Sequence, residues 1–158
     1  MTNLLKRLFF CPALVSAKAF LALILLAAGP VAAHEIKAGD LTIDHPFAYA
    51  SIGMAKAGAA FMTIRNAGAA DRLIAAESDV SVRTELHNHI HEGGKMMMRQ
   101  VPGIDVPAHG EASLAPGGYH VMFMGLKQKF VKGQMVPVTL VFEKAGRVQV
   151  EIMVIERQ

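Results

Sequence analysis

Cysteine is almost absent from the 158-residue sequence, in which Cys11 is the only one. A single cysteine forms no disulfide within the chain and supplies neither a redox dithiol nor a zinc site of the cysteine type. If Cys11 is removed during export, as the next paragraph predicts, a blue-copper centre is excluded as well, because it needs a thiolate ligand. The fold must then be stabilised by packing alone, and any metal must bind to other side chains.

Acidic residues are also missing from residues 1–33, which carry Lys6, Arg7 and Lys18. An apolar run from Ala19 to Ala33 follows and ends in small residues, as a signal-peptidase site requires. A run of about 15 residues is too short to span a bilayer, which takes roughly 20. We therefore predict that residues 1–33 are a cleaved secretory signal peptide and that residues 34–158 are a periplasmic domain without a stable membrane anchor.

Cys11 lies before the apolar run and follows Leu8-Phe9-Phe10, which lacks the small residue typical of a lipid-attachment site. We therefore expect it to be discarded with the signal. The remaining chain has 13 acidic residues and 16 − 3 = 13 basic ones, so it is close to neutral. Neutrality and the lack of a basic run argue against nucleic-acid binding. About 125 residues suit one domain, and this size and charge are compatible with a monomer.

Short apolar segments separated by Gly, Pro, Asn and Asp predict an all-β fold, an antiparallel sandwich or barrel. Ala57–Thr63 could also begin a helix, but the strand is favoured because Ile64–Gly68 looks like a strand entering a turn. The last two segments are typical of a hairpin. The predicted strands are Ile36–Ile43, Gly58–Arg65, Leu73–Ser78, Arg83–His91, Met96–Val101, Glu111–Leu114, His120–Leu126, Val136–Glu143 and Val148–Ile155.

Histidine and methionine gather on both sides of Gly93-Gly94, a dipeptide that favours a two-residue hairpin turn. With that turn, residue 91 opposes residue 96 and residue 89 opposes residue 98. Side chains alternate between the faces of a strand, and directly opposed residues share a face. One face of the hairpin therefore collects five potential ligands, namely His87, His89, His91, Met96 and Met98.

A second segment offers the same two ligand types, because alternation places His120, Met122 and Met124 on one face. If the two segments meet, they can form a site of two imidazoles and two thioethers. His87, Met98, His120 and Met122 are a plausible set, although His89, His91, Met96 and Met124 are chemically eligible neighbours. Soft neutral thioethers with imidazole favour Cu(I) over Zn(II), Ca(II) or Mg(II). Protons compete for imidazole, so affinity should weaken as the pH falls through about 6.5.

Other histidines and methionines have simpler explanations. Met97, Met135 and Met153 are expected to fill the core. For His89 and His91, an exposed surface position and an auxiliary role beside the metal are equally compatible with the pattern.

The spacing resembles the motif of the PCuAC-type periplasmic copper chaperones, H(M)-x10-M-x21-H-x-M. Similar stretches extend over nearly the whole predicted mature chain, among them Gly58–Asn66, Glu85–His87, Leu114–His120 and Met124–Leu126. The resemblance implies a cupredoxin-like β-sandwich that binds Cu(I) through the four residues named above. It also implies delivery of copper toward the CuA centre of cytochrome c oxidase, alongside Sco-type thiol proteins.

Cleavage after Ala33 would leave His34 as the first residue, with an α-amino group and an imidazole that together can chelate Cu(II). This second site competes with a simpler explanation, a frayed terminal residue, which is favoured.

Three other functions compete with a copper carrier. A copper-buffering or resistance protein without a dedicated recipient has the same sequence features. A copper enzyme is disfavoured, since two thioethers suit it poorly and no nucleophile, base and acid occur together. A metal-free interaction module would leave the clustering of His and Met unexplained.

Overall fold

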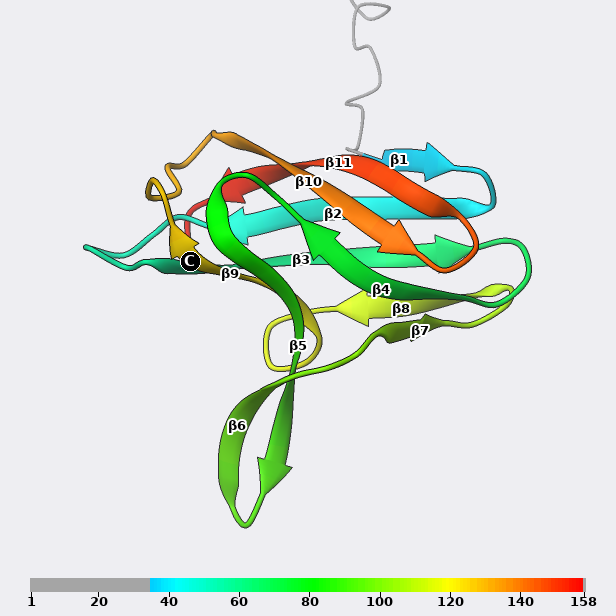
Figure 1. Ribbon diagram of the computed structural model, residues 1–158, viewed down its shortest axis with the longest axis horizontal. Coiled ribbons are helices and arrows are strands. Elements are labelled where there is room, and N and C mark those ends of the chain that lie inside the picture. Colours follow the sequence, from blue (N-terminus) through cyan, green and yellow to red (C-terminus); the bar gives the residue numbers. More distant parts are fainter. Residues whose placement is uncertain (1–34, 158) are drawn as a thin grey trace, which may run out of the picture. The chain divides into compact units, whose positions relative to one another are not determined.

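Eleven β-strands make up the regular structure of residues 35–157, the part of the chain that the computed structural model describes (Figure 1). These residues contain no helix, and so none that could cross a membrane. The strands are β1 (Glu35–Ala38), β2 (Leu41–Tyr49), β3 (Ala57–Asn66), β4 (Asp71–Glu77), β5 (Ser81–Glu92), β6 (Lys95–Gln100), β7 (Ile104–Val106), β8 (Gly110–Leu114), β9 (His120–Leu126), β10 (Met135–Phe142) and β11 (Gly146–Ile155).

The strands are hydrogen-bonded in the order β6-β5-β9-β3-β2-β11-β10-β4-β7, with β1 added to β2 and β8 to β3. All pairs are antiparallel except β2 with β11, which is parallel. Apolar side chains from both halves of this path, such as Phe123 of β9 and Leu140 of β10, belong to one buried core. The predicted antiparallel β-sandwich is therefore confirmed.

Alternation explains which side chains enter this core. In β10 every second residue is buried, and in β9 the buried Val121 and Phe123 flank Met122, whose side chain is on the opposite face. The period of two means that the residues between core positions are free to carry chemistry. In β9 those positions hold the histidine and the methionines singled out above.

Most predicted strands are present, including Ala57–Asn66 in place of a helix and the hairpin of β10 and β11. The single strand predicted over Ile36–Ile43 is wrong. Gly39, with φ of 61°, and Asp40 form a turn that divides it into β1 and β2, which pair with each other. The three-residue β7 was missed because a run as short as Ile104–Val106 shows no clear period.

Candidate metal centre

The β5–β6 hairpin has the register that its Gly-Gly turn predicts. Gly93 and Gly94 have φ of 59° and 75°, and a two-residue turn of type I′ needs positive φ at both positions. His89 is opposite Met98 and His91 is opposite Met96, so these four residues share one face of the hairpin. This part of the sequence-based prediction is confirmed.

Strand β9 lies against the other edge of β5 and brings the second group of ligands to the same sheet. His120 is opposite His87, and Met122 is opposite Glu85. On its far side β9 pairs with β3, where Met122 is opposite Ala59. The two segments that the sequence could only suppose to meet are thus adjacent strands, with His87, His120 and Met122 on one face.

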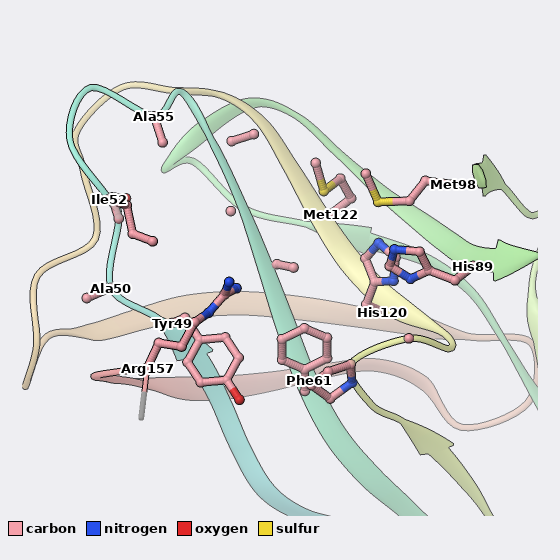
Figure 2. A pocket seen from close by; sticks show the side chains of 16 residues that line it. Tyr49, Ala50, Ile52, Ala55, Phe61, His89, Met98, His120, Met122 and Arg157 are labelled. Atoms are coloured by element: carbon pink, nitrogen blue, oxygen red, sulfur yellow. The ribbon is translucent and has the colours of Figure 1, made fainter. Parts of the chain in front are cut away.

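The imidazole rings are close together. The ring centroid of His120 is 5.9 Å from that of His87 and 5.0 Å from that of His89. Figure 2 shows the His89 and His120 rings together, with the sulfur atoms of Met98 and Met122 directed toward the same space. His120 is only 1% exposed, whereas Met98 is 51% exposed, so the group extends from the interior to the surface.

Hydrogen bonds determine the tautomer of two of these rings. The His87 Nε2–H donates to the Glu85 carboxylate at 2.9 Å, and the His120 Nδ1–H donates to the carbonyl oxygen of Gly118 at 2.9 Å. In each neutral ring the other nitrogen then carries a free lone pair. Within residues 35–157, buried His87 Nδ1 and His120 Nε2 have no hydrogen-bond partner, and the same is true of His89 Nδ1.

Burial lowers the pKa of His120 below its ordinary value of 6.5, and the nearby His89 and His87 lower it further. The hydrogen bond to Gly118 opposes this shift without cancelling it. His120 is therefore a neutral imidazole at pH 7, which is the form that binds a metal ion.

A pocket of about 360 Å³ adjoins the rings and is lined mainly by apolar side chains. Its lining includes His89, Met98, His120 and Met122, with the small residues Ala57 and Ala59 of β3 and the aromatic rings of Tyr49 and Phe61. Figure 2 shows these aromatic rings on the side of the pocket away from the two methionines. His87 is not part of this lining; it lies beside it, next to His120.

Histidine, cysteine and acidic side chains do not by themselves form a metal site in the described part of the chain. Among residues 35–157 no three His, Cys, Asp or Glu side chains are placed to hold one metal ion together. A metal site at the histidines would therefore have to include the methionine sulfurs.

The structure brings four sequence-predicted residues together, His87, Met98, His120 and Met122. His89, which the sequence offered as an auxiliary ligand, lies with them. His34 and the predicted signal peptide, residues 1–33, lie outside the described residues. Sequence reasoning missed the roles of Glu85 and of the Gly118 carbonyl, which orient the rings of His87 and His120. The position of Glu85 two residues before His87, on the same face of a strand, is the signal that could have revealed it.

Comparisons with known proteins agree with this fold. The model of the LpqE-like family, described as "Putative lipoprotein LpqE-like", matches residues 41–154. Among curated proteins, "Putative lipoprotein Lxx21020" of Leifsonia xyli subsp. xyli is 34% identical over 98 residues, 61% of this chain. The match spans 59% of that relative, so the chain covers about three fifths of the relative's length.

Solved structures with the same fold include the copper-bound PCuAC domain from PmoF2, with a TM-score of 0.66 and 27% identity over 78% of this chain and 99% of that domain. The Cu(I) form of DR1885 from Deinococcus radiodurans has a TM-score of 0.60 and 27% identity, over 83% of this chain and 87% of that one. PCuAC domains are cupredoxin-like β-sandwiches, and this chain has that fold.

Proposed function

The chain belongs to the LpqE-like family, and from that premise and the geometry of the β5–β9 site we propose that it is an exported copper carrier. The ion is Cu(I), and its ligands are His87 Nδ1, His120 Nε2 and the sulfur atoms of Met98 and Met122. His89 Nδ1 is the auxiliary nitrogen. The chain binds and releases the ion without catalysing a reaction.

One observation carries this proposal: buried imidazole nitrogens without a partner lie beside two thioethers. A buried polar atom normally has a hydrogen-bond partner, and one that lacks it calls for an explanation. A bound metal ion supplies that explanation for His87 Nδ1 and His120 Nε2, since each of these lone pairs would then be used. Glu85 and Gly118 hold the opposite ring nitrogens, which is the usual arrangement behind a metal-bound histidine.

The ligand types favour Cu(I). Thioether sulfur is soft and uncharged, so it binds a soft univalent ion better than it binds Zn(II), Ca(II) or Mg(II). The names of two similar structures agree with this choice, because one is a copper-bound PCuAC domain and the other is a Cu(I) form of DR1885.

X-ray absorption of the Cu(I)-loaded protein tests the ligand set directly. We expect two sulfur and two nitrogen neighbours, and we expect the sulfur contribution to disappear when Met98 and Met122 are both replaced by leucine. Met97→Leu is the matched control, because Met97 is on the opposite face of the hairpin. A spectrum without sulfur, or one that keeps its sulfur in the double variant, would refute the proposed site.

The same spectra decide between His87 and His89. The family spacing selects His87, whereas the register pairs Met98 with His89 and the pocket is lined by His89. We propose His87 as the ligand because its ring is held by Glu85 with Nδ1 left free. Loss of one nitrogen neighbour in His89→Ala but not in His87→Ala would reverse this assignment.

We further propose that the recipient is the CuA subunit of cytochrome c oxidase, with Sco-type proteins acting alongside. The exposure of Met98 supports a carrier, because a recipient's ligands must reach the ion as the carrier's own ligands leave. Mixing the Cu(I)-loaded protein with apo CuA subunit should move the ion to the subunit. Retention of copper by the carrier would favour instead the alternative function, a copper buffer without a dedicated recipient.

Export is the last part of the proposal. The names of the family and of its curated relative include the word lipoprotein, which agrees with a protein of the cell envelope. We propose a periplasmic domain of residues 34–158 that is released by cleavage after Ala33. Mass spectrometry of the exported protein tests this, because a mass that includes residues 1–33 or a lipid on Cys11 would contradict it.

A further inference from the structure

The tip of the β5–β6 hairpin carries ligand chemistry that the proposed four-residue site does not use. β9 begins at His120, opposite His87, so beyond that point β5 pairs with no strand other than β6. One backbone hydrogen bond, from the N–H of His89 to the carbonyl oxygen of Gly118 at 3.3 Å, still joins β5 to the loop before β9. Figure 1 shows this hairpin projecting from the rest of the strands. Within residues 35–157 no other strand is hydrogen-bonded to the outer part of the hairpin.

Two successive pairs on one face of the hairpin each combine an imidazole with a thioether. His89 is opposite Met98, and the next pair on that face is His91 with Met96. Directly opposed residues have Cβ atoms about 5 Å apart, close enough for one ion to bind both side chains. Consecutive pairs on a face are about 7 Å apart along the strand.

Exposure increases along this row of ligands. The side chain of His87 is 13% exposed, and His89 is half-buried. His91 is exposed, and Met96 is 57% exposed. The row therefore leads from the buried end of the proposed site to the surface of the hairpin tip.

Packing does not account for an imidazole and a thioether at this tip. Met96 is too exposed to fill a core, unlike Met62, which is buried in β3. The charged residues of the tip are on the other face, where Glu92 pairs with Arg99 at 2.9 Å. At the tip, the face with His91 and Met96 thus presents only uncharged ligands that suit Cu(I).

We propose that His91 and Met96 form a second, weaker Cu(I) site, from which the ion moves to or from the buried ligands by way of His89 and Met98. This inference rests on the proposed function of the buried site. The movement is a ligand exchange: bonds from Cu(I) to one nitrogen and one sulfur are replaced by bonds to the next pair. The ion remains Cu(I), the ligands remain neutral, and no electron or proton is transferred.

Methionine methyl groups labelled with ¹³C provide the test, with Cu(I) itself as the probe in the purified protein. The first equivalent of Cu(I) should shift the methyl signals of Met98 and Met122. A second, weaker equivalent should shift the signal of Met96 and leave that of Met97 in place. The double variant His91→Ala/Met96→Leu should lose the second equivalent, whereas Met97→Leu should keep both.

The outcomes separate this inference from the proposed function. A second equivalent that leaves the Met96 signal in place, or that the double variant retains, overturns the outer site. Failure of the first equivalent to shift Met98 and Met122 overturns the buried site itself. Denaturation curves of the double variant establish that the hairpin change has not unfolded the protein.

Discussion

Two of the places where the described residues bury polar side chains treat these groups in opposite ways. Near the start of β4, the Asp71 carboxylate accepts hydrogen bonds from the backbone N–H groups of Arg72, Lys144 and Ala145. The Asn66 side chain nearby donates to the carbonyl oxygens of Ala69 and Pro107 and accepts from the N–H of Gly68. These two side chains find their hydrogen-bond partners within the protein, and the bonds hold the adjoining loops in place.

Where β5 meets β9, by contrast, ring nitrogens of three histidines are buried without a partner in the described residues. The buried Arg72 Nε has no hydrogen bond in that part of the chain either, but the Asp105 carboxylate is 3.4 Å from it. The comparison indicates that paired polar groups stabilise the fold, whereas the imidazole nitrogens without a partner are available to a ligand, which in the proposed function is the copper ion.

The largest expected effect is on Cu(I) affinity, at the proposed site where β5 meets β9. Replacing Met98 and Met122 with leucine nearly conserves volume, so the fold should survive with a loss below about 1.5 kcal/mol. Cu(I) affinity should fall by more than about 100-fold, because even residues behind the ligands contribute 10–100-fold. Competition with a chromophoric Cu(I) chelator measures this. An affinity within a few-fold of the original protein would mean that the thioethers are not ligands.

Near the start of β4, Asp71→Ala should reduce the free energy of unfolding by about 2 kcal/mol, because it leaves three backbone N–H groups without their acceptor. Urea denaturation measures the loss. Cu(I) affinity should not change, because the carboxylate has only a structural role. If Asp71→Ala also lowered Cu(I) affinity, the contrast between the structural role of Asp71 and the ligand role of the histidines would be wrong.

Glu85→Ala should have a smaller effect, a decrease of about tenfold in Cu(I) affinity, or about 1.4 kcal/mol. Its carboxylate holds the His87 ring, and without it the ring must be ordered when the ion binds. Glu92→Ala is the matched control on the same strand, because Glu92 pairs with Arg99 rather than with a histidine. Equal Cu(I) affinities of the two variants would mean that Glu85 does not contribute to Cu(I) binding.

The smallest effect is a difference in pH dependence of the apo protein. The pKa of His120 is lowered by burial, so the unfolded chain binds its proton more readily than the folded one. The stability from neutral His120 is complete above its ordinary value of 6.5 and is lost as the pH falls below it. In His120→Gln the free energy of unfolding should therefore depend less on pH between pH 7.5 and about pH 4. Urea denaturation at a series of pH values measures this dependence.

The ionised Asp71 carboxylate also stabilises the fold, and this stabilisation is lost at a lower pH than that from His120. Burial opposes its charge, but the N–H groups of Ala145, Arg72 and Lys144 outweigh burial and hold its pKa below the ordinary value of 3.8. Its contribution is complete above that value and is lost as the pH falls through the lowered pKa. Asp71→Ala should therefore remove a step below about pH 4 and leave the step of His120 in place. If either variant removed the decreases in stability near both pH values, the two residues would not titrate independently and this prediction would be wrong.

The hairpin of β5 and β6 could be predicted in detail because its register depends on neighbours in the chain. The Gly93-Gly94 turn fixes which residues are opposite, and alternation fixes their faces. The same local logic failed at Ile36–Ile43, where Gly39 and Asp40 make a turn inside an otherwise strand-like run. The parallel pairing of β2 with β11 joins residues about 100 positions apart, and no local pattern predicts it.

The sequence by itself determined the chemistry available to this protein: imidazoles and thioethers at alternate positions of three strands, with a single cysteine. Only the tertiary structure decided that β9 pairs with β5, which sets His120 opposite His87 and Met122 opposite Glu85. It also decided which ring nitrogens remain free, because Glu85 and the Gly118 carbonyl hold the others. Alternation is a property of one strand, whereas strand pairing and burial depend on how the whole chain packs.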